Sequence, residues 1–283
     1  MDTWWRELGQ PDPFTVVEAG AGRGALARAV LAAGPDCSPA LRYVAVERSS
    51  ALRGQHPGGA QSQAALPIGP ITGVVLANEL LDNLPFRLLQ RAPDGWWEVR
   101  VDGSLSEVLV PGPPGVGERL AADAPVGARI ALQAIAASWL EMTLGRIAHG
   151  RIAVFDYADT TPAMARRPWT DWVRTYRGHG RGGHPLIDLG RQDVTCEVAV
   201  DQLAAVRLPT ADRIQADFLR SHGIDELADD ARRAWRERAH IGDLRALTAR
   251  SRVGEAAALT DTSGLGGFRV LEWAQGSGPV GPG

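Results

Sequence analysis

The segment VVEAGAGRGALARAVLAAG, residues 16–34, constrains the fold of this chain more than any other part of the sequence. Apolar β-branched residues lead to Glu18, and three glycines follow at alternate positions, Gly20, Gly22 and Gly24, before an alanine-rich run. This order predicts a strand, a tight turn and a helix, which is the unit that opens many nucleotide-binding folds.

The details of this turn favour S-adenosylmethionine over a dinucleotide. A dinucleotide-binding turn reads G-x-G-x-x-G, whereas the third glycine here comes one residue early. A pyrophosphate prefers backbone amides with no carboxylate nearby, but Glu18 lies two residues before the first glycine. S-adenosylmethionine carries an ammonium and a sulfonium in place of phosphate, so an acid suits it. The sequence therefore predicts this cofactor and disfavours an NAD-linked oxidoreductase.

A second acid fits the ribose of either cofactor. The next predicted strand, residues 41–47, ends in Glu47, about 20 residues after the turn, where an acid commonly binds ribose hydroxyls. The alternative is that Glu47 is a solvated residue at a strand end.

The remaining pattern predicts an α/β fold. Its mostly parallel sheet carries an inserted antiparallel β-meander and helical additions. Continuous apolar runs favour parallel strands that are buried on both faces, and the turn signals Pro93-Asp94-Gly95 and Asp102-Gly103 separate short alternating segments. Further strands are predicted at 71–78, 151–157, 194–200 and 267–273, with helices at 2–9 and 128–148 and a possible strand just before residue 71.

We predict one domain over residues 1–273. Within it we expect the meander at 84–110, a long loop at 160–193 and a helical addition at 201–258, with residues 274–283 forming a disordered tail.

The sequence NELLDNLP marks a second candidate site. Asn78 and Glu79 end a buried apolar run and Asp82 follows, and ligands of open α/β sheets bind at the carboxyl ends of strands. Two carboxylates suit a guanidinium, which they can hold through paired hydrogen bonds. Alternatively, both acids cap the helix that follows.

A third segment, TYRGHGRGGH, offers candidate substrate contacts. Tyr176, Arg177 and His179 could line the entrance for a substrate, or they could belong to a surface loop held by its own hydrogen bonds. No metal site is expected, because the histidines lack the regular four-ligand spacing of a closed zinc site.

Composition excludes several classes of protein. The net charge of −3 gives no sign of nucleic-acid or membrane binding, and the two cysteines make no disulfide framework. We expect a cytoplasmic protein without a signal peptide or a transmembrane helix.

The motifs EAGAGRG, ANELLDNLP, FDY, TYRGH and LTDTSGLGGFRVLEW occur in this order. In this the sequence resembles the MidA-type S-adenosylmethionine-dependent methyltransferases, a family that includes a mitochondrial complex I assembly factor acting on protein arginine. The resemblance runs from about residue 4 to residue 273. It implies a class I methyltransferase core, which is Rossmann-like, with added elements. It also implies that Glu18 and the three glycines surround the methionine part of the cofactor. Glu47 would hold the ribose, and Asn78, Glu79 and Asp82 would lie at the methyl end.

Two features depart from that family. A Gly-Asp-Phe-x-Thr pattern usually precedes the first strand and is absent here, so we expect either an upstream segment or a missing wall of the site. Residues 56–69 contain no acid for the adenine amine, so Leu66 is expected to pack on the ring.

The predicted function is therefore methyl transfer from S-adenosylmethionine to an exposed arginine of a protein. The alternatives are methylation of a small molecule and a non-catalytic binding or assembly module that uses the same fold.

Overall fold

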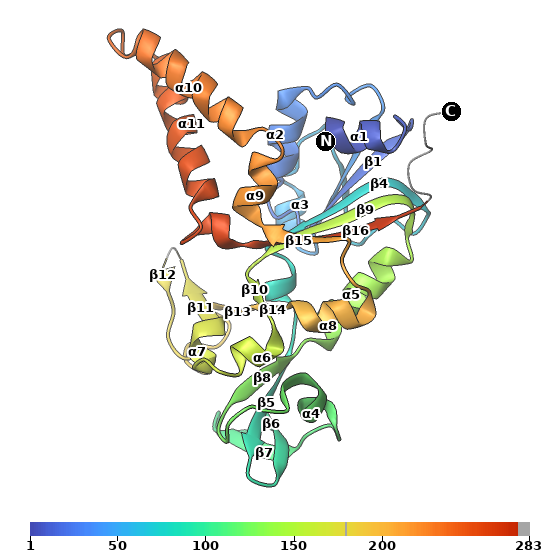
Figure 1. Ribbon diagram of the computed structural model, residues 1–283, viewed down its shortest axis with the longest axis vertical. Coiled ribbons are helices and arrows are strands. Elements are labelled where there is room, and N and C mark those ends of the chain that lie inside the picture. The colour runs from blue at the N-terminus through green and yellow to red at the C-terminus, as the bar shows by residue number, and fades with distance from the viewer. Residues whose placement is uncertain (179, 277–283) are drawn as a thin grey trace. The chain divides into compact units, whose positions relative to one another are not determined.

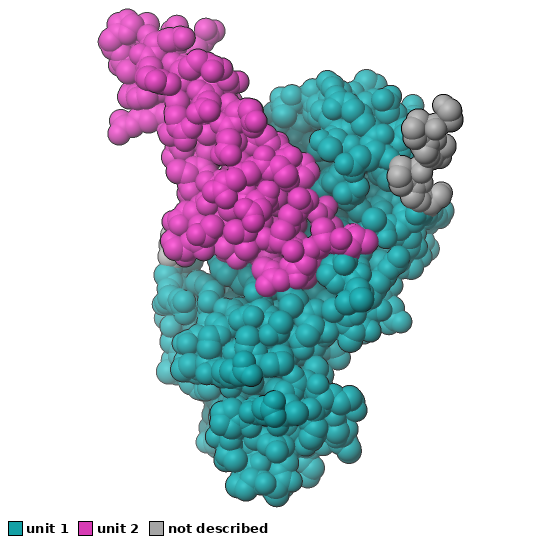
Figure 2. All heavy atoms as spheres, viewed as in Figure 1, with its two compact units in different colours: residues 1–209, 273–283 teal, residues 210–272 magenta. Residues whose placement is uncertain are grey.

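The computed structural model describes residues 1–178 and 180–276 (Figure 1). Contacts divide the chain into two compact units, where the sequence predicts a single domain over 1–273. Unit 1 comprises residues 1–209 and those from 273 onward, and unit 2 comprises residues 210–272 (Figure 2). Among the described residues, no helix combines the length and apolar character needed to cross a membrane.

A seven-stranded sheet carries the fold, in the order β15-β16-β9-β4-β1-β2-β3. The five neighbours from β9 to β3 run parallel, and β15 and β16 pair antiparallel. This mostly parallel sheet confirms the predicted fold class. The strands are β1 (Phe14–Ala19), β2 (Leu41–Val46), β3 (Gln61–Gln63), β4 (Ile71–Asn78), β9 (Ile147–Asp156), β15 (Ala211–Ile214) and β16 (Arg269–Gln275).

The central strands are buried on both faces. Neighbouring residues such as Val16 and Val17, or Val74 and Val75, point to opposite faces and are all fully buried. This explains the continuous apolar runs in the sequence. The helices of unit 1 are α1 (Asp2–Glu7), α2 (Ala25–Ala33), α3 (Ser50–Arg53), α4 (Val116–Ala121), α5 (Ala134–Leu144), α6 (Thr161–Met164), α7 (Trp169–Trp172) and α8 (Val200–Val206).

The predicted meander is present and gains a fourth strand. β5 (Arg87–Ala92), β6 (Gly95–Val101) and β7 (Glu107–Pro111) pair antiparallel, and β8 (Arg129–Leu132) adds to β5. The helix predicted from residue 128 is wrong at its start, because residues 129–132 form β8. Neighbouring side chains on a strand point to opposite faces, and accordingly Ile130 and Ala131 are buried in two different hydrophobic clusters.

The long loop predicted at 160–193 is also wrong. This stretch contains α6, α7 and a small antiparallel sheet of β11 (Val173–Arg177), β12 (Gly180–Arg181) and β13 (Asp193–Cys196). Burial of Met164, Trp172 and Val173 in one cluster holds these short elements. A two-stranded parallel sheet of β10 (Ala158–Asp159) and β14 (Val198–Ala199) follows the end of β9.

The helical addition predicted at 201–258 is divided between the two units. Its start is α8 of unit 1, and β15 of unit 2 interrupts the range. The helices of unit 2 follow: α9 (Gln215–Arg220), α10 (Ile224–Arg238), α11 (Leu244–Thr260) and the short 3-10 helix η2 (Leu265–Gly267). The predicted tail begins too early, since β16 extends to Gln275, and residues 277–283 lie outside the described part of the chain.

Candidate active site

The glycine turn joins β1 to α2 through backbone that only glycine adopts readily. Gly20, Gly22 and Gly24 have φ of 76°, 52° and 74°. A Cβ added to Gly22 would meet no atom within 4 Å, outside its own chain neighbours. At Gly22 the backbone therefore faces open space that a ligand could fill.

Glu18 lies beneath this turn, near the end of β1. Its side chain is buried, and Oε2 accepts a hydrogen bond of 2.8 Å from the Tyr43 hydroxyl. Burial raises the pKa of Glu18, while the Tyr43 hydroxyl acts in the opposite direction. The structure thus brings Glu18 to the turn, with Tyr43 as one of its partners.

Glu47 follows β2 and contacts the same turn. Its Oε2 accepts the Gly22 N–H at 3.1 Å and its Oε1 accepts the Ser49 N–H at 2.8 Å. A carboxylate has about four acceptor positions, so it can still accept hydrogen bonds from a ribose diol. These contacts argue against the alternative of a solvated strand end.

His56 is a member of this site that the sequence reasoning missed. Its Nε2 lies 3.0 Å from the Gly22 carbonyl oxygen, and its Nδ1 lies 2.9 Å from the Ser62 hydroxyl. Glu47 and His56 therefore hold the two polar backbone groups of Gly22. A histidine in a loop 34 residues away carries no local signal of this contact.

Asn78 and Glu79 are exposed at the carboxyl end of β4. Glu79 has a φ of 47°, in the left-handed region that is uncommon for any residue other than glycine. Its N–H donates to the Phe155 carbonyl at 2.9 Å, which fixes this backbone against β9. Such strained residues cluster at active sites and ligand clamps.

Asp82 lies in the 3-10 helix η1 (Leu81–Asn83) and is buried. Burial, together with the negative charge of Glu79, raises the pKa of Asp82 to about 6. Of the alternative that both acids cap a following helix, only the position of Asp82 in the first turn of η1 is found. This helix has three residues and receives no side-chain cap hydrogen bond.

Asp156, the last residue of β9, anchors η1 and was not predicted as a site residue. Its Oδ2 accepts the N–H groups of Leu81 at 3.0 Å and Asp82 at 3.2 Å, and its Oδ1 accepts the Tyr157 N–H at 3.0 Å. Only 1% of Asp156 is exposed, and burial followed by the charge of Asp82 raises its pKa well above the ordinary value. The motif FDY gives no local sign of these three contacts.

Two tyrosines share the surroundings of these acids. Burial and then the charge of Glu79 raise the pKa of the Tyr157 phenol, and Tyr176 on β11 adds to the increase. The Arg174 guanidinium lies 5.2 Å from the centre of the Tyr157 ring. The carboxyl ends of β4 and β9 therefore form a corner of carboxylates and aromatic rings.

The other predicted contacts are not brought together here. Arg177, the last residue of β11, forms an exposed ion pair of 2.7 Å with Asp188, and His179 lies outside the described residues. Leu66 lines a cavity with Thr15 and Ile71. Both of these are at the amino ends of strands, and the packing of Leu66 on adenine stays a prediction.

The two cysteines of the chain are not suited to act as nucleophiles. Cys37 and Cys196 are both buried, and burial raises the pKa of Cys37 to about 11 and that of Cys196 further. Neither is therefore poised as a thiolate. No cluster of three or more potential metal ligands occurs within residues 1–178 and 180–276.

The residues present fit S-adenosylmethionine. The open backbone at Gly22 can approach the ligand, and Glu47 retains acceptors for a ribose diol. Glu79 and Asp82 follow β4, which is the neighbour of β1 in the sheet, and they lie at the edge where such ligands bind.

Comparison with known proteins agrees with this fit. Residues 1–213 match the family described as "Putative S-adenosyl-L-methionine-dependent methyltransferase". The chain is similar to the crystal structure of an uncharacterized protein from Burkholderia thailandensis, with 25% sequence identity and a TM-score of 0.76. The match covers 97% of this chain and 76% of that one. A second protein from the same organism, bound to S-adenosyl-homocysteine, has 25% identity and a TM-score of 0.75 over 97% and 74%. No curated protein has a matching sequence.

Proposed function

We propose that this chain, which belongs to the matched family of S-adenosyl-L-methionine-dependent methyltransferases, methylates the guanidinium of an arginine in a protein. The observation that carries the choice of substrate is the pair Glu79 and Asp82 at the carboxyl end of β4. One carboxylate is exposed on strained backbone and the other is buried beside it.

A guanidinium is the nucleophile that this corner suits best. It is planar, carries five N–H donors and pairs with carboxylates through two parallel hydrogen bonds. An anionic nucleophile would be repelled by the same two charges. The Arg174 guanidinium already lies 5.2 Å from the centre of the Tyr157 ring, so this corner is one in which a guanidinium lies beside an aromatic ring.

When bound, S-adenosylmethionine supplies an electrophilic methyl group on a positively charged sulfur. Glu79 and Asp82 hold the guanidinium and align one nitrogen with that methyl carbon, so that an N–C bond forms as the S–C bond breaks. The methylated nitrogen must then lose a proton. Asp82 can accept it, because its pKa of about 6 lies closer to neutrality than that of an ordinary carboxyl.

The test is single-turnover methylation of an arginine-containing protein extract with labelled S-adenosylmethionine. Glu79→Gln and Asp82→Asn keep the shape of each side chain and remove its charge, and each is expected to slow transfer at least about tenfold, equivalent to 1.36 kcal/mol. Their affinity for S-adenosyl-homocysteine should be unchanged. Glu118→Gln is the matched control, because Glu118 is an exposed carboxylate on α4. This variant should react at the wild-type rate.

Hydrolysis of the labelled product identifies the acceptor. Recovery of methylarginine supports the proposal. Label on another side chain or on a small molecule would overturn the choice of substrate. Tight binding of S-adenosyl-homocysteine without any transfer by the wild type would favour a non-catalytic module.

A further inference from the structure

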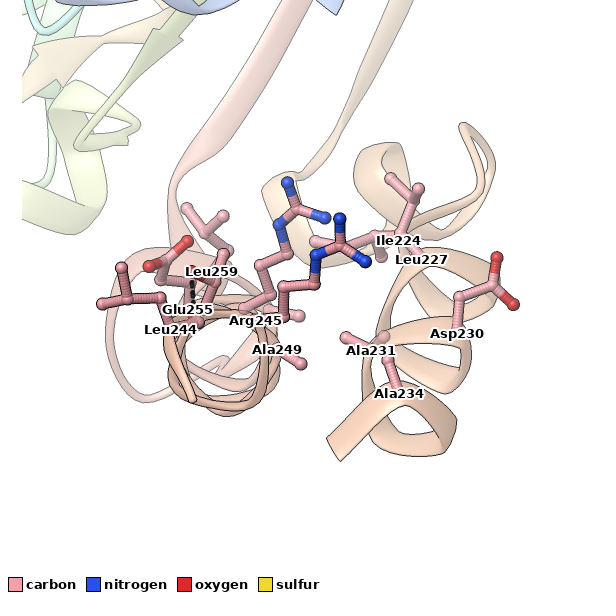
Figure 3. A pocket seen from close by; sticks show the side chains of 14 residues that line it. Ile224, Leu227, Asp230, Ala231, Ala234, Leu244, Arg245, Ala249, Glu255 and Leu259 are labelled. Atoms are coloured by element: carbon pink, nitrogen blue, oxygen red, sulfur yellow. Dashed lines mark hydrogen bonds between the residues drawn. The ribbon is translucent and has the colours of Figure 1, made fainter. Parts of the chain in front are cut away.

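The helical hairpin of unit 2 carries an open groove that the methyltransferase site does not use. The groove has a volume of about 880 Å³ and lies between α10 and α11 (Figure 3). Alanines form its floor, and larger aliphatic side chains from both helices form its walls. Because alanine side chains are short, the helices leave a hollow where longer residues would have filled the space.

The walls of the groove are unusually exposed for apolar residues. Leu227 on α10 is 68% exposed, and Leu244 and Leu259 on α11 are 81% and 36% exposed. Contiguous apolar surface of this kind typically marks a binding site for a protein.

Charge distinguishes the possible partners. Four charged residues line the groove. Asp230 pairs with Arg233, whereas Glu255 accepts a 2.7 Å hydrogen bond from the neutral Ser251 hydroxyl and keeps its charge. The guanidinium groups of Arg245 and Arg252 form no hydrogen bond or ion pair with another described residue, and Arg245 has only a longer-range attraction to Asp243. Two guanidinium groups stand against one carboxylate that has no cationic partner, so the charge at the groove is positive on balance.

The surrounding backbone limits the form of the partner. Both walls are α-helices, whose interior N–H and C=O groups are bonded within each helix, so the groove offers no edge to which a strand could add. Recognition must come from side chains, as when an amphipathic helix places its apolar face in a groove.

We propose that the α10–α11 groove binds an amphipathic helix of another protein, with aliphatic residues on its buried face and acidic residues beside them. A second copy of this chain fits less well. In a two-fold contact the same surface meets itself, so two surfaces that are both positive on balance would be brought together. This proposal does not depend on the methyltransferase reaction or its substrate.

The test measures binding of fluorescent 18-residue amphipathic peptides to the full chain by anisotropy. One peptide set carries Glu beside a Leu face, and the matched set carries Lys at the same positions. We expect the Glu peptides to bind at least about tenfold more tightly than the Lys peptides. Arg245→Glu combined with Arg252→Glu should reverse this preference.

Apolar variants separate the groove from the rest of the hairpin. Leu227→Asp combined with Leu244→Asp should weaken binding of the Glu peptides at least about tenfold. Leu247→Asp is the matched control, because Leu247 is 53% exposed in the same first turn of α11 and does not line the groove. An acid in a first helical turn is favourable, so all three substitutions should leave the hairpin folded.

Three results would overturn the proposal. They are equal binding of the Glu and Lys peptides, no binding of either set, and wild-type affinity in the Leu227→Asp, Leu244→Asp variant. Concentration-dependent dimers that this double variant abolishes, without peptide binding, would assign the groove to a second copy of the chain.

Discussion

Glu47 links the glycine turn to the predicted ribose site. Its carboxylate already accepts two backbone N–H groups, one of them from Gly22, so it is held in place before any ligand arrives. A group held in this way loses little conformational entropy on binding, which favours affinity.

Replacing Glu47 by Ala should therefore weaken binding of S-adenosyl-homocysteine by about 1.5–3 kcal/mol, the range for hydrogen bonds to charged groups. Titration calorimetry measures this directly. Arg42→Ala, on the same strand and with its side chain bonded to Gln61 at the opposite end, is the control and should bind normally. Wild-type affinity in Glu47→Ala, with the fold intact, would remove Glu47 from the site.

Asp82 should give the reaction its acidic limit. With a pKa of about 6, its carboxyl is charged above that pH and neutral below it, so it can hold a guanidinium only in the higher range. The rate of methyl transfer is therefore expected to rise with pH through about 6. Asp82→Asn should lack this limb of the profile, and an identical limb in the variant would assign it to another group.

Ionisation of Asp82 should lower the free energy of unfolding, although it raises the rate of methyl transfer. The pKa of Asp82 is raised from 3.8 on folding, so the folded chain holds this proton more tightly than the unfolded chain. Its contribution to the free energy of unfolding is complete below about pH 4 and is lost as the pH rises through about 6. Chemical denaturation measures this effect. As the pH rises from about 4 through about 6, the free energy of unfolding should fall more in the wild type than in Asp82→Asn.

Among the elements, η1 is fastened to the end of β9 by one side chain. Asp156 accepts hydrogen bonds from Leu81, Asp82 and Tyr157, and so fastens the turn that carries Asp82 to the end of β9. Nothing in the three residues of η1 would hold them there by helix propensity alone.

Asp156→Asn keeps one acceptor oxygen for the three backbone N–H groups that the carboxylate accepts, so at least one buried N–H group faces an amide donor. We expect a loss of about 1–3 kcal/mol in the free energy of unfolding, the cost of leaving a buried donor unpaired. Methyl transfer should slow as Asp82 shifts, while affinity for S-adenosyl-homocysteine stays near wild type. Equal losses in cofactor affinity and in rate would indicate general damage instead of displacement of η1.

The strands and helices that could be predicted are those with a strong local pattern. β1, β2 and β4 are continuous apolar runs, α2 lies between two left-handed glycines, and the meander has two turn signals. β8 was missed because residues 129–132 run without a break into the apolar start of α5, and only pairing with β5 separates them.

Across the whole molecule, the site is assembled by the parallel sheet. Glu18, Glu47, Glu79 and Asp156 are far apart in sequence, but each lies at or next to the carboxyl end of a strand in one sheet. The two acids beside the turn could be predicted because they follow a known spacing. Asp156 and His56 could not, because their roles depend on strand neighbours and loops that no local pattern specifies.

The same sheet depends on a close approach between two glycines. Gly73 on β4 and Gly150 on β9 are partners in register, with φ of 144° and 149°. A Cβ on Gly150 would lie 1.8 Å from the Gly73 carbonyl oxygen, and a Cβ on Gly73 would lie 2.0 Å from that of Thr15. The three central strands can pair here only where neither position has a side chain.

Gly150→Ala should consequently destabilise the whole of unit 1, since it combines a forbidden backbone conformation with a clash against backbone that cannot move aside. We expect a loss of at least about 3 kcal/mol, measured by chemical denaturation. Gly145→Ala is the matched control, because Gly145 ends α5 with φ of −64° and its added Cβ would be in ordinary contact at 3.5 Å. It should be as stable as wild type or slightly more so. If Gly150→Ala unfolds at the same denaturant concentration as this control, the pairing of β4 with β9 must differ from the one described. The strand ends that bring Glu79 and Asp156 together would then need to be reassigned.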